Sequence, residues 1–165
     1  MESVAMLKPF PELTHLALYM ISKWNDEPTV SLPNSFLDRT VPHLQSLTLF
    51  NISFPGLPKL LLSATHLIKL DLFYDLPPGF WYNPPEVMTT SLFPLTSLDC
   101  LRIHFGYPSF APQSRCPPLL TRSILPILTT MHFEGASGYL EEILAWIDAP
   151  RLNLTSMMIC PYSTP

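Results

Sequence analysis

Cys100, Arg102 and His104 form the arrangement in this sequence that comes nearest to a catalytic site. Alternate residues of a strand share one face, so the thiol, the guanidinium and the imidazole would be neighbours. A nearby cation can lower the pKa of a thiol and raise its reactivity. A nucleophile also needs a base and a group that orients the base, and signatures of such sites, G-x-S-x-G or H-E-x-x-H, do not occur. We therefore expect no catalytic residues and no enzymatic activity.

Cofactor, metal and nucleic-acid sites are also not indicated. Cys100, Cys116 and Cys160 lack the C-x-x-C spacing of a metal or redox centre. Neither G-x-G-x-x-G nor the P-loop motif occurs, and the chain has only five Gly, so no nucleotide cofactor is expected. The nine Lys and Arg are scattered and the net charge is -4, whereas nucleic-acid binding requires clustered cations.

The elements that would position these side chains follow a repeated phrase, L-x-x-L-x-L, which is typical of the strand of a leucine-rich repeat. Three copies are strict, and later ones substitute Ile, Met or Phe. The starts are separated by 31, 23, 31, 30 and 26 residues, so the repeat is irregular. The six phrases span residues 13–18, 44–49, 67–72, 98–103, 128–133 and 154–159.

Proline precedes the phrase in five copies, where it ends a helix and favours an extended residue before it. Helical spacing is found between the phrases. The expected helical segments are 35–39, 57–64, 85–92, 122–125 and 138–147.

The pattern predicts a single α/β domain over residues 1–165. We expect an irregular leucine-rich-repeat solenoid, a partial horseshoe with a parallel inner sheet and short outer helices. A doubly wound α/β domain is the first alternative, although its buried strands tend to be Val and Ile runs, and Val is scarce here. An all-helical array is the second, although 20 Pro would break most long helices.

Three longer phrases resemble the leucine-rich region of fungal F-box-like proteins. They are Phe10-Pro-Glu-Leu-Thr-His-Leu-Ala-Leu18, Val41-Pro-His-Leu-Gln-Ser-Leu-Thr-Leu49 and the run from Phe54 to Leu72, and segments 118–126 and 139–150 are similar. The resemblance implies a horseshoe that recognises proteins without catalysis, as the substrate-recognition part of a ubiquitin-ligase adaptor.

The sequence departs from that family in three ways. The F-box would precede the repeats, and Met1 to Lys8 is too short to contain it. The asparagine expected at the ninth position of each repeat is missing, so the loops must satisfy their amides otherwise. No polar cap follows the sixth phrase. We therefore expect a fragment of a longer arc, and an incomplete fragment without independent function is the second hypothesis; a small α/β hydrolase is the third.

Positions three, five and seven of each phrase should lie on the inner, concave face if positions one, four and six are buried. Among these residues, an aromatic row of Tyr19, Phe50 and Phe73 and a charged row of Asp71, Arg102 and His132 are the candidate partner-binding residues. The expected surface comprises His15, Ala17, Tyr19, Ser46, Thr48, Phe50, Lys69, Asp71, Phe73, Cys100, Arg102, His104, Thr130, His132, Glu134, Ser156, Met158 and Cys160.

Less specific interpretations stay open for both rows. Phe50 and Phe73 could turn under a loop and fill the core, while Asp71 and Arg102 could form an ordinary surface ion pair. A second candidate region is the loop edge, where Trp81, Tyr82, Tyr107 and Phe110 stand among prolines; these rings either contact a partner or cover the core.

The expected setting is intracellular, in the cytoplasm or the nucleus, because no secretory leader is evident and the cysteines are odd in number. The longest charge-free run, 40–58, is interrupted by prolines and polar residues, so no membrane span is expected. The partner should be a protein of unknown identity, bound by a monomer or by part of a larger chain.

Overall fold

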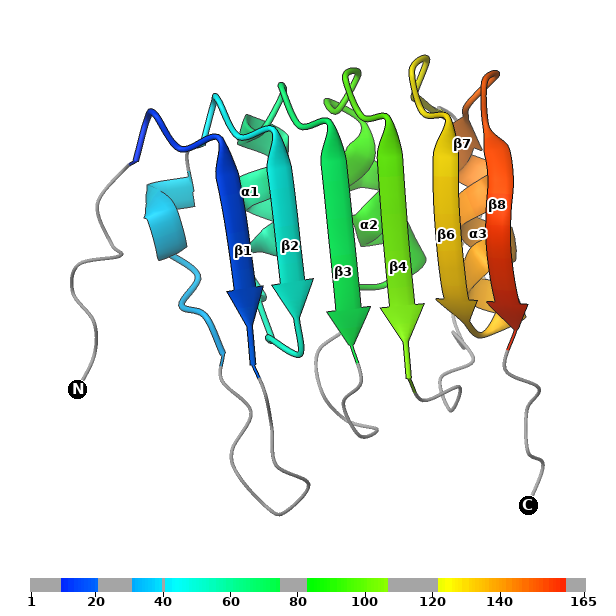
Figure 1. Cartoon of the computed structure of the whole chain (residues 1–165), viewed down its shortest axis with the longest axis horizontal. Helices are drawn as coiled ribbons and strands as arrows, with labels where there is room; N and C mark the ends of the chain where they lie inside the picture. Colours follow the sequence, from blue (N-terminus) through cyan, green and yellow to red (C-terminus); the bar gives the residue numbers. More distant parts are fainter. Residues whose placement is uncertain (1–9, 21–30, 40, 75–82, 107–121, 160–165) are drawn as a thin grey trace.

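The computed structural model describes residues 10–20, 31–39, 41–74, 83–106 and 122–159, and within them the chain adopts an α/β fold. Three α-helices in this part of the chain lie behind one face of an all-parallel sheet, and no helix covers the other face (Figure 1). The elements are β1 (His15–Tyr19), η2 (Phe36–Arg39), β2 (Ser46–Phe50), α1 (Leu57–Ser63), β3 (Lys69–Tyr74), α2 (Pro85–Leu92), β4 (Cys100–Phe105), β5 (Ser123–Ile124), β6 (Thr130–Gly135), α3 (Ser137–Trp146), β7 (Ile147–Asp148) and β8 (Asn153–Ile159).

The main sheet follows the order of the chain, β1-β2-β3-β4-β6-β8, and every neighbouring pair is parallel. Equivalent positions of the phrases pair with one another: Leu16 with Leu47, Leu70 and Leu101 in succession, and Leu101 with Met131. The first five phrases were therefore aligned correctly from the sequence.

A tight turn recurs at the start of each of these phrases. The N–H of the first leucine donates to the carbonyl three residues earlier, as in Leu44 to Val41 at 3.1 Å and Leu98 to Leu95 at 3.0 Å. The rings of His43 and His66, which stand just before two of these leucines, stack with centroids 6.1 Å apart. The same local structure is thus repeated from unit to unit.

The sixth phrase was misaligned. The equivalent turn joins Leu152 to Ala149 at 3.1 Å, so the phrase begins at Leu152 and not at Leu154. Met157 pairs with Phe133, a position-six residue, whereas the sequence pattern placed it at position four. The pairing shifts by one residue next to Thr155, as in a β-bulge, and a bulge cannot be read from Leu spacing.

The core lies between the sheet and its helices. Leu47, Leu49, Leu70, Leu72 and Leu101, at positions four and six, are fully buried. The helices contribute apolar faces to the same cluster, with Leu60 and Leu61 from α1, Met88 and Leu92 from α2, and Leu140 and Ile143 from α3. Burial of this continuous apolar layer is the main stabilising contribution that the structure shows.

The helix predictions are largely confirmed. Segments 57–64 and 85–92 correspond to α1 and α2, each with a proline in its first turn, where the missing N–H has no cost. Segment 138–147 corresponds to α3, shifted by one residue. Segment 35–39 forms only the single 3-10 turn η2.

The prediction of a helix at 122–125 was wrong. Ser123 and Ile124 form the short strand β5, which pairs in parallel with β7. Pro126 restricts the preceding residue to extended conformations, and the N–H of Leu125 donates to the carbonyl of Asp148 at 2.8 Å. Ser123 also donates its hydroxyl to the carbonyl of Thr89, 2.8 Å away, which fixes the strand against α2.

Backbone hydrogen bonds satisfy several amides just after the strands end. The amides of Met20 and Gly106 donate to the last carbonyl of the neighbouring strand at 2.9 and 2.8 Å, and the amide of Asn51 donates to the carbonyl of Phe73 in β3 at 2.8 Å. Asn51 has a φ of 55°, in the left-handed region that asparagine tolerates better than most residues. In the part of the chain that is described, no helix is long and apolar enough to cross a membrane.

Candidate functional site

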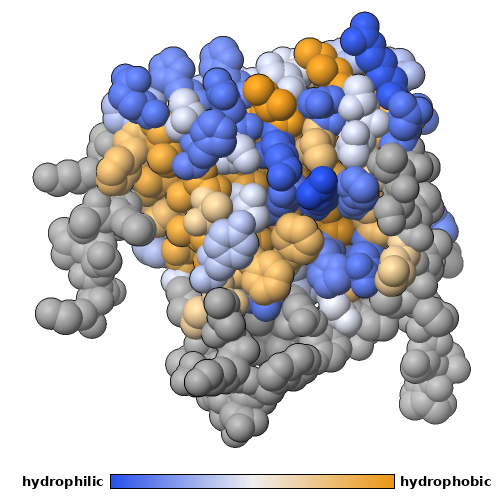
Figure 2. Space-filling model, in the orientation of Figure 1, coloured by the Kyte–Doolittle hydropathy of each residue, from blue (hydrophilic) through white to orange (hydrophobic). Residues whose placement is uncertain are grey.

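The helix-free side of the sheet, called the open face below, carries the side chains at positions three, five and seven. Along β2 the burial alternates residue by residue, with Leu47 and Leu49 buried and Ser46, Thr48 and Phe50 half-buried. The predicted division of each strand between two faces is thus confirmed for β2, and β4 and β6 show the same alternation. Figure 2 views the open face, where apolar groups and strongly hydrophilic groups lie side by side.

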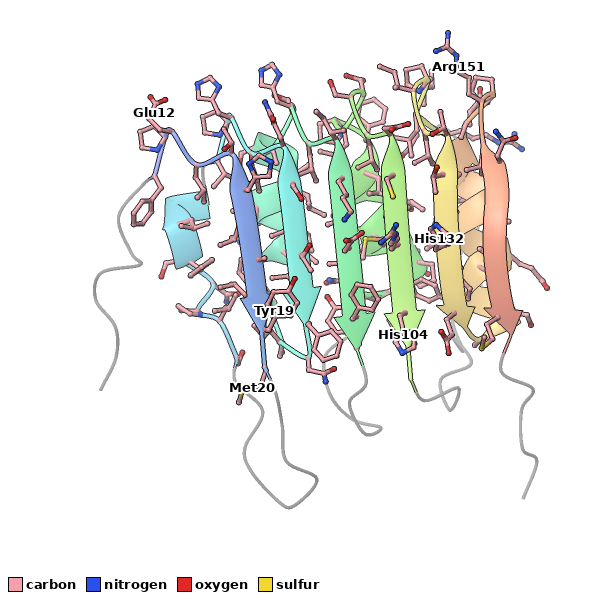
Figure 3. All side chains as sticks on the ribbon, in the orientation of Figure 1. Glu12, Tyr19, Met20, His104, His132 and Arg151 are labelled. Atoms are coloured by element: carbon pink, nitrogen blue, oxygen red, sulfur yellow. The ribbon has the colours of Figure 1, made fainter. Side chains whose placement is uncertain are left out.

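An aromatic row crosses the open face at position seven. Tyr19, Phe50, Phe73 and His104 are paired in register on β1, β2, β3 and β4. Consecutive ring centroids are 6.2, 5.8 and 5.9 Å apart, and the rings are tilted by 34–38°. These separations lie within the range of favourable aromatic contacts. In Figure 3, Tyr19 and His104 mark the two ends of the row, near the arrowheads of β1 and β4.

The rings of this row are not core residues. Tyr19 is 64% exposed. Phe50 and Phe73 are half-buried and lie outside the buried cluster behind the sheet, so the interpretation in which they fill the core is wrong. A strand residue at position seven points away from the position-six leucine, which explains this placement.

An ion-pairing residue and an exposed thioether continue the row beyond the rings. Nδ1 of His104 lies 2.8 Å from Oε2 of Glu134, and because a carboxylate only accepts, Nδ1 carries the proton. Glu134 pairs in register with Met158, which is 59% exposed. Sequence reasoning placed His104 and Glu134 on this face without selecting them as site residues. Their shared position with Phe50 and Phe73 was the available signal.

The charged row is also assembled as expected, because Asp71 pairs in register with Arg102, and Arg102 with His132. The expectation that Asp71 is exposed was wrong, since its side chain is only 5% exposed. Nζ of Lys69 lies 2.9 Å from Oδ2 of Asp71, whereas Nε of Arg102 lies 3.9 Å from Oδ1, too far for a hydrogen bond. Asp71 therefore forms an ion pair with both cations, and Lys69, which sequence reasoning did not select, is the closer partner.

Cys100, Arg102 and His104 do share the open face, but the thiol is not activated. Burial raises the pKa of the Cys100 thiol, and the opposing effect of Arg102 is smaller. A raised pKa lowers the fraction of thiolate, which is the nucleophilic form. In the described ranges, no three His, Cys, Asp or Glu side chains are grouped so that they could hold a metal ion.

A hollow of about 270 Å³ lies where the two rows meet over β4 and β6. Its wall includes Phe73, Arg102, His104, His132 and Glu134, together with Met158 from β8. Aromatic, cationic and thioether groups therefore line one concave spot, whereas Tyr19 and Phe50 lie outside it. The loop-edge candidates Trp81, Tyr82, Tyr107 and Phe110 lie outside the described residues.

Comparisons of the chain with protein-family models, with curated proteins and with solved structures found no match. The functional argument therefore rests on the chemistry of the open face.

Proposed function

We propose that this chain is a non-catalytic leucine-rich-repeat module, an irregular solenoid that binds another protein through the open face. The observation that carries the proposal is the continuous row from Tyr19 to Met158, whose apolar groups are half-buried or exposed on a face that no helix of the described residues covers. Repeat units that are stacked in chain order, each contacting its neighbours, support the solenoid architecture.

The composition of the face supports recognition of a protein. Rigid aromatic side chains lose little conformational entropy on binding and provide most of the affinity in many protein interfaces. Tyr19, Phe50 and Phe73 are such groups, and they are already held at fixed spacing by their mutual contacts. Mostly polar groups at positions three and five lie along one side of the row, and interfaces commonly place polar groups beside apolar ones.

The adaptor role in ubiquitin ligation is the specific form of this proposal. It is supported by the resemblance of the phrases at 10–18, 41–49 and 54–72 to fungal F-box-like proteins. In that form the open face would hold the protein that is to be ubiquitinated, and the chain would contribute binding without catalysis.

The test begins with a random peptide library displayed on phage and selected on the immobilised wild-type chain. The double variant Phe50→Ala with Phe73→Ala should weaken binding of the selected peptides by about tenfold or more, because interface aromatics often contribute at least 1.4 kcal/mol together. Affinities are measured by fluorescence anisotropy of labelled peptides. Circular dichroism verifies that the variant is folded.

The matched control is Leu62→Ala with Phe93→Ala, which removes two apolar side chains that are 53% and 59% exposed on the helix side. This control should leave the affinities unchanged. Equal losses in both double variants, or no peptide that binds the wild-type chain above background, would contradict binding through the open face.

A further inference from the structure

We infer that the hollow between the two rows binds a carboxylate of the partner, so that the open face selects an acidic peptide segment with a neighbouring apolar residue. This inference rests on the proposed function and specifies the chemistry of the partner. The inference depends on how closely each charged side chain of the open face is paired. It also depends on the residues around Arg102, whose nearest acid is 3.9 Å away.

Two acids of the open face have close cationic or hydrogen-bonding partners. Asp71 is held by Lys69 at 2.9 Å, and Glu134 accepts a hydrogen bond from His104 at 2.8 Å. Neither carboxylate is therefore positioned to attract a cationic partner. A basic peptide would have to break one of these contacts before it gained its own.

Arg102 is ion-paired as well, but its contact with Asp71 is longer than the contacts of these two acids. Within the described residues, Asp71 is the nearest acid, at 3.9 Å from Nε, and its Oδ1 and this Nε both lack a hydrogen-bond partner. The arginine side chain is 41% exposed and forms part of the wall of the hollow. A guanidinium offers donors in a planar fork that matches a carboxylate. The charge complementarity of the hollow therefore favours an anion.

The surroundings of Arg102 indicate a carboxylate on a peptide. His132 pairs in register with Arg102 and lines the same hollow, so its ring can donate a second hydrogen bond. Phe73 and Met158 also line the hollow and offer apolar surface beside the charged groups. Figure 3 shows His132 midway along β6 and His104 farther along β4. The hollow is lined by residues of both rows. An Asp or Glu beside a Leu, Met or aromatic residue matches this combination.

The experiment uses the peptides selected on the wild-type chain. Their sequences should be enriched in Asp or Glu next to an apolar residue. Arg102→Gln should weaken binding of the acidic peptides by about tenfold, the effect of about 1.4 kcal/mol from a charge-assisted contact. Arg102→Lys keeps the charge but loses the planar fork of donors. Its affinity for the acidic peptides should lie between that of the wild-type chain and that of Arg102→Gln. Replacement of the peptide acid by its amide should remove the difference between wild type and Arg102→Gln.

Lys59→Gln is the control, because Lys59 is an exposed cation on α1, behind the sheet. It should leave the affinities unchanged, whereas an equal loss would reduce the effect to general electrostatic attraction and overturn the inference. Selected peptides without acids, or with phosphate-dependent or basic motifs, would also overturn it. If Phe50→Ala with Phe73→Ala weakens binding and Arg102→Gln does not, the proposed function stands and the carboxylate site is wrong.

Discussion

The two faces of the sheet are built from the same strands but differ in burial and in residue type. On the covered face, the position-four and position-six side chains of β1 to β4 are all Leu or Ile, and those of β2, β3 and β4 are at most 1% exposed. On the open face, rings, charges and hydroxyls alternate with them, one residue away in the chain, and most are half-buried. The comparison shows that regular leucine spacing determines the fold, while the intervening residues are free to vary in chemistry. The proposed binding surface is therefore the face whose residues the fold leaves free to vary.

The largest difference between the two faces should appear when a charge is introduced on each face in turn. Leu47→Asp puts a carboxylate into a fully buried layer, where an unpaired charge costs several kcal/mol, and should abolish cooperative folding. Ser46→Asp puts the same group on the half-buried open face next to Lys69 and should leave the chain folded. Thermal unfolding followed by circular dichroism distinguishes them. A folded Leu47→Asp variant would mean that the covered face is not a tightly packed core.

A smaller effect is expected from a single methyl group at the end of β6. A Cβ on Gly135, which has a φ of 155°, would lie 3.0 Å from Cδ2 of Phe105 and 3.1 Å from Cζ of Phe133. Gly135→Ala should therefore lower the free energy of unfolding by about 1–3 kcal/mol in urea titrations.

Gly138→Ala is the matched control for this substitution. Nothing lies within 4 Å of a Cβ at Gly138, which is in the first turn of α3. Alanine has the higher helix propensity, so Gly138→Ala should be neutral or should stabilise by up to about 1 kcal/mol. Equal destabilisation by both substitutions would exclude ring crowding as the cause.

The smallest expected effect on stability comes from the charge of Glu142, on α3 behind the sheet. Burial, and secondarily Glu86, raise the pKa of Glu142 on α3. Since the folded pKa exceeds the unfolded one, the ionised carboxylate destabilises the fold at neutral pH. Stability from this group is regained as the pH falls through the folded pKa. Glu142→Gln should therefore raise the thermal midpoint slightly at pH 7.

At a pH below both pKa values of Glu142, this advantage should disappear, because the wild-type carboxyl is then protonated in either state. Glu141→Gln, at the exposed neighbouring position, is the control and should change the midpoint less. An advantage of Glu142→Gln that is independent of pH would contradict the electrostatic cause.

The structural features that depend on residue periodicity could be predicted from the sequence. Leucine offsets predicted the register of β1, β2, β3, β4 and β6 and the buried side of β2, β4 and β6, and apolar spacing with prolines located α1, α2 and α3. These features follow from local geometry, so a single chain contains enough information to derive them.

The remaining features depend on contacts between units. The extra residue at Thr155 leaves the leucine pattern nearly intact while it shifts the pairing. Burial of Asp71 depends on Lys69 within its own strand and on Arg102 across the sheet, and the bond between His104 and Glu134 joins residues 30 positions apart. The hollow needs all of these placements at once, so the spacing of one phrase could not reveal it.

Leu49 and Phe50 test the division between the faces most directly, because they are consecutive residues of β2 with opposite orientations. The measurement is the free energy of unfolding in urea for Leu49→Ala and for Phe50→Ala. We expect Leu49→Ala to lose about 2–5 kcal/mol, since it opens a cavity in the buried layer. Phe50→Ala should lose about 1 kcal/mol or less, the scale of cross-strand contacts on an open face. A loss for Phe50→Ala as large as that for Leu49→Ala would show that the aromatic row stabilises the fold and would contradict its assignment as a binding surface.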